Sequence, residues 1–287
     1  MSSTQAFDPE RFKRESQSSW DAAAAGWEKW WDTFEKAGRS VSHRLIELAH
    51  IKPGDRVLDI ATGTGEPAIT AARTVGPKGH VLGVDHSIAM VEVARRRAAR
   101  EGVTNVEYRE GEAATLKVLE RNFDAVLCRW GLMFVPDLNS AARAIRDCLK
   151  PGKWLATAVW DTADKVPMIA IAAKQVREIV NLPQPPPGTP NPLSLADTTI
   201  LQRALSSAGF RDFSVEPMTV TWEFDSVEAF LECRRDISYD FRMAVANQSP
   251  EVQKKLAEAV THEARQYIGA DGKMRIPNQA LVIAAHI

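Results

Sequence analysis

Residues 56–68 read RVLDIATGTGEPA, and this stretch decides the fold. A short apolar run, typical of a buried strand, ends in a turn with glycines at positions 63 and 65, and an alanine-rich helical segment follows. Gly63, Gly65 and Ala68 match the G-x-G-x-x-G/A pattern, in which glycines let the backbone approach a ligand closely. The amide groups that open the next helix supply further hydrogen-bond donors for that ligand.

Strand-like and helix-like segments alternate on both sides of this turn. Such alternation is typical of βαβ units, which give a parallel sheet with helices on both faces and a ligand site at the carboxyl ends of the strands. The predicted strands are 56–60, 80–84, 106–109, 123–128, 154–160, 213–224 and 280–286. The predicted helices around them are 41–49, 87–100, with Ser87 as its N-cap, 140–149, 167–180 and 197–208.

Composition limits the class of partner. The 287 residues carry a formal net charge of −1, which gives no electrostatic basis for binding nucleic acid. Cys128, Cys148 and Cys233 are far apart, so neither a disulfide framework nor a metal site is indicated. The N-terminus lacks the pattern of a signal peptide, and no apolar run reaches membrane-spanning length. We therefore expect a cytoplasmic protein with no bound metal, no membrane span and no nucleic-acid partner.

The glycine turn alone fits two cofactors, NAD and S-adenosylmethionine. Asp85 lies twenty residues after Gly65 at the end of the next strand, where a carboxylate can accept from both ribose hydroxyls and repels a 2′-phosphate. Two further acids favour S-adenosylmethionine. Asp59 precedes the turn and can lie near the ammonium of a methionine moiety, and Glu112, after the third strand, can accept from an adenine amino group.

At these positions the sequence resembles the class I methyltransferases, and within them the ubiquinone/menaquinone biosynthesis C-methyltransferases. The resemblance is carried by five segments, namely 57–65, 83–85, 111–113, 123–126 and 149–152. It implies a Rossmann-like α/β fold with a mostly parallel seven-stranded sheet whose last strand is antiparallel, a helical N-terminal extension and a helical insertion before the last strand. It also implies S-adenosylmethionine as cofactor.

The resemblance assigns a role to each matched position. The turn from Ala61 to Gly65 is expected to hold the methionine part, Asp85 the ribose, and Arg129 and Trp130 the space between cofactor and acceptor. The implied cofactor-binding residues are Asp59, Ala61, Thr62, Gly63, Gly65, Asp85, His86, Met90, Gly111, Glu112, Ala113, Arg129 and Trp130. Two positions depart from the family pattern, because Ala61 replaces a glycine and Glu112 replaces an aspartate.

Methyl transfer is an SN2 displacement, so the main requirement is alignment of the reactants in a dry pocket. A general base is needed only where the acceptor must lose a proton. Asp161, which follows the fifth strand, and His43 are the candidates we retain, although a capping role for Asp161 and a structural role for His43 are favoured. His86 and Asp236 are weaker alternatives.

The acceptor is expected to be a small, aromatic or apolar molecule methylated at C, O or N. Trp27, Trp30 and Trp31 can form an aromatic lid over it, or they can pack in a helical core. Arg235 and Tyr239, with Arg234 beside them, can meet an anionic or phenolic group, although a solvent-facing helix surface is the favoured interpretation.

We predict three parts: residues 1–50 as a helical cap or lid, residues 51–225 with 270–287 as the cofactor-binding α/β domain, and residues 226–269 as a helical insertion that forms part of the acceptor pocket. Two other functions remain open, an NAD-dependent oxidoreductase and a cofactor-binding module without turnover. The oligomeric state is not set by the sequence, and a homodimer is one option.

Overall fold

The computed structural model describes residues 7–116, 121–181 and 185–287. Its contacts divide the chain into two compact units. The first, here called the helical unit, comprises residues 1–38, 162–189 and 219–279, and the second, the α/β unit, comprises residues 39–161, 190–218 and 280–287.

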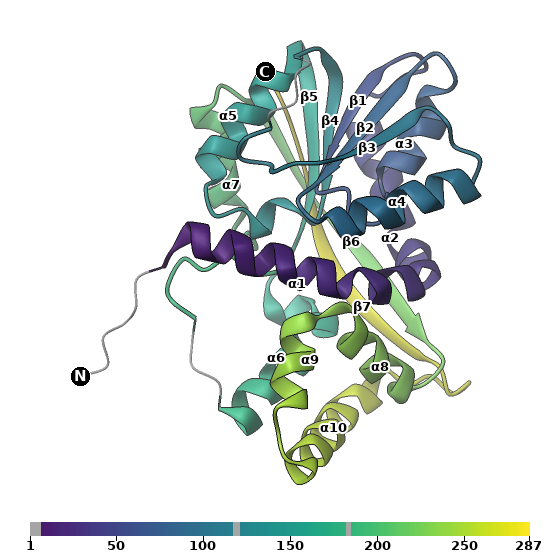
Figure 1. Ribbon diagram of the computed structural model, residues 1–287, viewed down its shortest axis with the longest axis vertical. Helices are drawn as coiled ribbons and strands as arrows, with labels where there is room; N and C mark the ends of the chain where they lie inside the picture. The colour runs from purple at the N-terminus through teal and green to yellow at the C-terminus, as the bar shows by residue number, and fades with distance from the viewer. Residues whose placement is uncertain (1–6, 117–120, 182–184) are drawn as a thin grey trace. The chain divides into compact units, whose positions relative to one another are not determined.

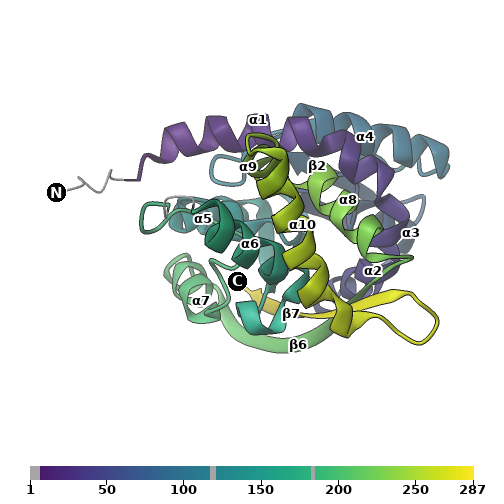
Figure 2. The same ribbon diagram turned by 90° about the horizontal axis from the view of Figure 1, so that it is seen from below.

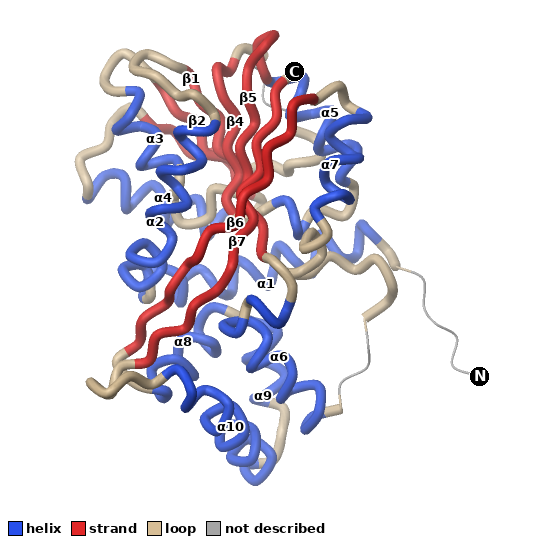
Figure 3. The backbone as a smooth tube through the Cα atoms, turned by 180° about the vertical axis from the view of Figure 1, so that it is seen from behind, coloured by secondary structure: helices blue, strands red, loops and turns tan. Residues whose placement is uncertain are grey.

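The α/β unit is built on a seven-stranded sheet with strand order β3-β2-β1-β4-β5-β7-β6. Strands β1 to β5 pair in parallel, whereas β7 runs antiparallel to β5. The predicted Rossmann-like sheet is therefore confirmed, and Figures 1 and 3 show its twist. The strands are β1 Arg56–Ile60, β2 His80–Asp85, β3 Val106–Glu110, β4 Phe123–Arg129, β5 Leu149–Trp160, β6 Arg211–Phe224 and β7 Met274–His286.

Helices cover both faces of this sheet, with α3 and α4 on one face and α5 and α7 on the other (Figure 1). Each of these helices begins either after a side chain that accepts a hydrogen bond from an unpaired amide of the first turn, or after a residue whose backbone conformation suits a helix start. The Ser87 hydroxyl accepts from the amide of Met90 at 3.1 Å, which confirms the predicted N-cap. The helices are α3 Ala68–Val75, α4 Ile88–Arg100, α5 Leu138–Cys148 and α7 Thr198–Ser207, with the 3₁₀ turn η1 Leu132–Phe134.

The helical unit has a core of aromatic side chains. Trp27 stacks on Phe34 with ring centroids 4.3 Å apart, and Phe34 meets Trp222 edge-on at 4.6 Å. Figure 2 shows α6 and α10 side by side in this unit. Its helices are α1 Pro9–Lys29, α6 Pro167–Val180, α8 Val227–Ile237, α9 Tyr239–Ala246 and α10 Pro250–Ala264, with the 3₁₀ turns η2 Ala163–Lys165 and η3 Arg265–Tyr267. Among the helices of the described residues, none is long and apolar enough to span a membrane.

Three element boundaries differ from the predicted ones. The second helix, α2, begins at Trp31 and ends at Leu48, because α1 ends at Lys29 and its C-cap residue, Trp30, donates its amide to the carbonyl of Gly26. Strand β5 begins at Leu149 and β7 at Met274, several residues before the expected starts, because pairing extends each strand beyond its most apolar part.

The contacts also divide the chain differently from the three predicted parts. Helix α6 and the outer halves of β6 and β7 belong to the helical unit, whereas residues 39–48 belong to the α/β unit. The division into two units follows the packing of the elements rather than their order along the chain. Helix α6 contacts α10, and the side chain of Trp222 on β6 lies against Phe34.

Gly26 of α1 lies against the backbone at Asp236 of α8. A Cβ atom there would lie 2.2 Å from the backbone carbonyl oxygen of Asp236. Alanine improves helix propensity by about 1 kcal/mol, but this contact is too short for a backbone atom to yield cheaply. We therefore expect Gly26→Ala to lower the free energy of unfolding, measured by urea denaturation. Ala25→Gly, on the exposed side of α1, serves as the control and should cost about 1 kcal/mol. A more stable Gly26→Ala protein would contradict the observed packing.

Candidate cofactor site

The carboxyl ends of the parallel strands gather the predicted cofactor residues at one edge of the α/β unit. Thr62 and the glycine turn follow β1, while Asp85 ends β2. Gly111 follows β3, and its amide donates to the carbonyl of Asp85 at 2.9 Å. Trp130 follows β4, and its amide donates to the carbonyl of Ala158 on β5 at 2.8 Å. The topology therefore brings together residues that are up to seventy positions apart in the sequence.

The two glycines of the turn have different surroundings. Gly63 has φ +55°, and a Cβ atom at this position would meet nothing within 4 Å. Gly65 has φ +111°, and a Cβ there would lie 3.1 Å from the Tyr108 hydroxyl and 3.4 Å from the Cα of Ala94 in α4. Gly63 is therefore the position with open space for a ligand, while Gly65 permits close helix packing. Ala61 also adopts a positive φ of 53°, which is strained for a residue with a Cβ.

Asp85 ties this turn to the second strand. Its Oδ2 accepts from the amide of Gly63 at 2.8 Å and its Oδ1 from the amide of Ser87 at 2.9 Å. The side chain is buried. Two oxygens of a carboxylate offer about four acceptor positions, so the same group can accept from the hydroxyls of a ribose. This geometry suits the predicted ribose contact.

Asp59 is the most unusual acid of the site. Its Oδ2 accepts from the Thr62 hydroxyl at 2.6 Å and from the amide of Ala68 at 3.1 Å. Its Oδ1 is buried and has no hydrogen-bond partner. Burial raises the pKa of Asp59 to about 8, although the Thr62 hydrogen bond and the positive charge of Arg129 oppose this rise.

The acidic residues of the site indicate which of the two cofactors, S-adenosylmethionine or NAD, fits it. A buried carboxylate with one unbonded oxygen favours a nearby cation, such as the ammonium of S-adenosylmethionine. Glu66, on the same turn, is also buried and accepts from the amide of Thr70 at 3.2 Å. An ionised Asp59 matches a cationic ligand and repels the pyrophosphate that NAD places at such a turn. The donor set therefore fits S-adenosylmethionine and disfavours NAD.

The residues predicted for the adenine lie after β2 and β3. Met90 is buried in α4, and His86 is half-buried just before that helix. The Glu112 carbonyl accepts from the amides of Thr115 and Leu116, so Glu112 and Ala113 open a turn. Contact between these side chains and an adenine ring stays a prediction.

An indole pair that the sequence did not reveal stands at the same edge. Trp130 stacks on Trp160 with ring centroids 4.5 Å apart and an angle of 9° between the rings. Trp130 has a φ of 60°, rare for a bulky residue, and its indole Nε1 is buried without a partner. Arg129 lies over the Trp130 ring and donates to the Ser42 hydroxyl at 2.7 Å. Register could have suggested the pair, because both tryptophans end neighbouring strands.

The two candidate bases lie in different surroundings. Asp161 directly follows β5 and is 5% exposed, so it is buried near the cofactor edge of the strands. His43 is exposed on α2, which does not suit a base in a dry pocket. We therefore retain Asp161 as a candidate and set His43 aside.

The residues predicted for the acceptor lie in the helical unit. The indole Nε1 of Trp27 donates to the carbonyl of Ile237 at 3.1 Å, and that of Trp30 donates to Asp236 at 2.8 Å. These bonds fasten α1 to α8 and favour the packing role of both half-buried indoles, while Trp31 is buried. Arg235 is exposed, and the side chain of Tyr239 lies outside the described residues.

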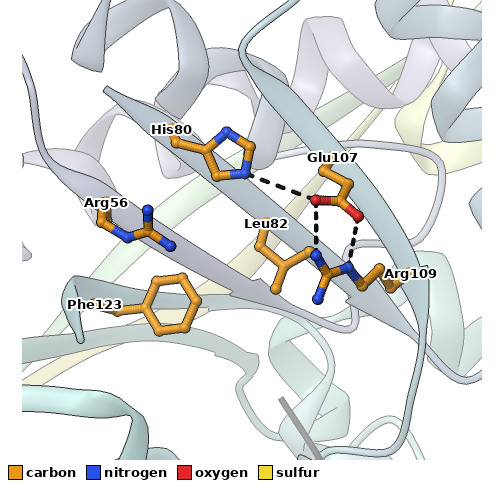
Figure 4. A pocket seen from close by; sticks show the side chains of 6 residues that line it. All are labelled: Arg56, His80, Leu82, Glu107, Arg109 and Phe123. Carbon is orange, nitrogen blue, oxygen red and sulfur yellow. Dashed lines mark hydrogen bonds and ion pairs between the residues drawn. The ribbon is translucent and has the colours of Figure 1, made fainter. Parts of the chain in front are cut away.

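A cavity of about 180 Å³ lies at the other end of the strands (Figure 4). Arg56 and His80, which line it, are the first residues of β1 and β2. Within it Arg109 forms two hydrogen bonds with Glu107, at 2.6 and 2.9 Å. This cavity is therefore separate from the glycine turn.

The raised pKa of Asp59 predicts how stability depends on pH. Because the native pKa of about 8 exceeds the ordinary aspartate value, the native state holds a proton that the unfolded chain has released. The free energy of unfolding should fall as pH rises from about 4 to about 8, with a slope approaching about 1.4 kcal/mol per pH unit from this group. Urea denaturation at several pH values should show a shallower decline in Asp59→Asn. The exposed Asp225→Asn variant should keep the wild-type slope, and parallel curves for wild type and Asp59→Asn would contradict the assignment.

Known sequences match part of the chain. A 2-phytyl-1,4-naphtoquinone methyltransferase from Synechococcus elongatus is 38% identical over 116 residues, which cover 38% of this chain and 50% of that protein. A ubiquinone/menaquinone biosynthesis C-methyltransferase from Teredinibacter turnerae is 40% identical over 116 residues, covering 38% of this chain and 47% of that protein. The chain thus spans about half the length of the curated relatives it matches.

Solved structures share the fold at lower identity. A phosphoethanolamine N-methyltransferase 2 of Haemonchus contortus, solved with phosphomonomethylethanolamine and S-adenosylhomocysteine, covers 98% of this chain and 61% of its own, with a TM-score of 0.58 and 22% identity. The YcgJ protein of Bacillus subtilis covers 86% of this chain and 98% of its own, with a TM-score of 0.55 and 19% identity.

A family model described as a methyltransferase domain matches residues 51–205, more than half of the chain. The matched range includes every strand end at which the candidate cofactor site is built. The chain therefore belongs to the family of methyltransferase domains, whose methyl donor is S-adenosylmethionine.

Proposed function

We propose that this protein is an S-adenosylmethionine-dependent methyltransferase that moves a methyl group to a C, O or N atom of a small apolar or aromatic molecule. The observation that carries the proposal is the buried carboxylate of Asp59, with one oxygen unbonded, beside a glycine turn held by Asp85. A cationic cofactor with a ribose satisfies both groups, and the family match is to a methyltransferase domain.

The bound cofactor supplies an electrophilic methyl group on its sulfonium. In the proposed site, Asp85 holds the ribose hydroxyls while the backbone at Gly63 leaves room for the chain that joins ribose and methionine. Asp59 faces the ammonium and becomes ionised there, because a nearby cation favours the charged carboxylate. His86, Met90 and the turn at Glu112 enclose the adenine.

The protein's part in the reaction is to align the acceptor and exclude water. The Trp130–Trp160 stack gives a rigid, apolar wall where strands β4 and β5 end. Asp161 can take a proton from a phenol or an activated carbon, and it is idle when the acceptor atom is already nucleophilic. The helical segments supply the acceptor walls in this proposal, with the 1–50 segment as the cap.

The acceptor class is the open part of the proposal. The relatives from Synechococcus and Teredinibacter are named for naphthoquinone and ubiquinone or menaquinone substrates, so a planar quinol-like ring is the first acceptor to test. The net charge of −1 supports a small molecule rather than nucleic acid as the partner. A cytoplasmic location and a homodimer complete the proposal.

Calorimetry with S-adenosylhomocysteine and with NAD tests the cofactor. We expect micromolar or tighter binding of S-adenosylhomocysteine and none of NAD. Asp85→Ala should weaken binding by more than ten-fold, because hydrogen bonds from both ribose hydroxyls to a charged group are lost. Asp225→Ala, which changes an exposed aspartate of the helical unit, should bind as wild type does. Binding of NAD in place of S-adenosylhomocysteine would refute the proposal.

A second measurement examines Asp59. The ammonium should lower the pKa of Asp59 from about 8, so binding at pH 7 should release a proton. Repeating the titration in buffers with different ionisation enthalpies counts this proton. Asp59→Asn should release none from this position, and equal proton release by both proteins would place the ammonium elsewhere. Methyl transfer itself is checked by incubating wild type with labelled S-adenosylmethionine and a panel of quinols and phenols.

A further inference from the structure

Arg234 occupies a core position of α8. The buried residues of this helix are Val227, Phe230, Cys233 and Ile237. Arg234 follows Phe230 by four residues and precedes Ile237 by three, so its side chain projects from the same face. Arg235, one position later, is exposed. The sequence does not separate these two neighbouring arginines, whereas the structure places one inside and one outside.

No acid of the described residues neutralises Arg234. Its Nε is buried without a hydrogen-bond partner, and the side chain as a whole is only partly exposed. Of the three acids of α8, Glu232 and Asp236 both pair with Lys29 of α1 at 2.7 Å, and Glu228 lies in the first turn of the helix. Burial lowers the pKa of Arg234, because desolvation disfavours the charged guanidinium. Among the described residues, Arg234 thus has no anionic partner.

An aromatic ring lies beside this cation. The guanidinium carbon of Arg234 is 6.0 Å from the centroid of the buried Phe241 ring, in α9. A guanidinium that packs over a ring by its face keeps its N–H groups in its own plane. Those N–H groups match the two oxygens of a carboxylate, which arginine binds through paired hydrogen bonds. Phe241 offers an apolar surface to the rest of such a ligand.

An uncompensated charge in a partly buried position destabilises a protein, and replacing it with an apolar side chain is often neutral or stabilising. A partly buried arginine without an anionic partner is therefore better explained by binding of a ligand than by a contribution to folding stability. Arg234 also lies outside residues 51–205, so it belongs to a part of the chain that the family match does not include.

We propose that Arg234 binds the carboxylate of an apolar or aromatic acid. This anion site lies in the helical unit and can be measured independently of methyl transfer.

The test uses 2-naphthoate and its uncharged analogue 2-naphthamide as probes. Calorimetry is carried out on the full-length protein with and without saturating S-adenosylhomocysteine. Wild type should bind 2-naphthoate at least ten-fold more tightly than 2-naphthamide. Arg234→Met should lose this preference, Arg234→Lys should keep part of it, and Arg235→Met, the matched control on the same helix, should behave as wild type.

Thermal unfolding distinguishes a ligand site from a structural role. Arg234→Met should have a Tm equal to or above that of wild type, because it removes an unpaired charge. A clearly lower Tm for Arg234→Met would assign the arginine to folding and overturn the inference. It is also overturned if wild type binds both probes equally or binds neither, or if Arg234→Met keeps the preference. Loss of S-adenosylhomocysteine binding in wild type would instead refute the proposed function, since that titration does not depend on Arg234.

Discussion

The hydrogen bond from the Gly63 amide to Asp85 is the constraint on which the cofactor site depends. At 2.8 Å it fastens the turn after β1 to the end of β2, and the second oxygen of Asp85 bonds Ser87, the N-cap of α4. One carboxylate therefore sets the position of the turn, the end of a strand and the start of a helix. Parallel pairing of β1 with β2 and β4 then brings the other strand ends to the same edge.

The turn and the strands were predictable because their signals are local. An apolar run, two glycines and an acid twenty residues later define one βαβ unit by chain order alone. Local signals gave the wrong start for β5. Pro151 and Gly152 look like a turn in the sequence, but β5 runs through them because pairing with the neighbouring strand extends to Leu149. Trp160 was missed for a related reason. An indole at the end of a strand suggests core packing, and its stacking on Trp130 depends on the register between two strands.

The protonation state of a buried acid and the hydrogen-bond partners of a side chain could not be inferred from the sequence. The pKa of Asp59 rises through burial, which the position of one aspartate in a strand does not reveal. Arg234 and Arg235 look alike in the sequence, and only the packing of α8 distinguishes them. Likewise the sequence left Trp27 and Trp30 between a lid and core packing, because the acceptors of their indole N–H groups lie about 200 residues away on α8.

Each unit contains an ionisable group with a buried atom that lacks a hydrogen-bond partner. In the α/β unit this group is Asp59, which a nearby cation ionises, and in the helical unit it is the guanidinium of Arg234, which favours an anion. An ammonium satisfies the first group and a carboxylate satisfies the second. The family match covers residues 51–205 and so includes the first group but not the second. Cofactor chemistry therefore follows from the family, whereas the anion site that we propose at Arg234 follows from residues outside the matched range.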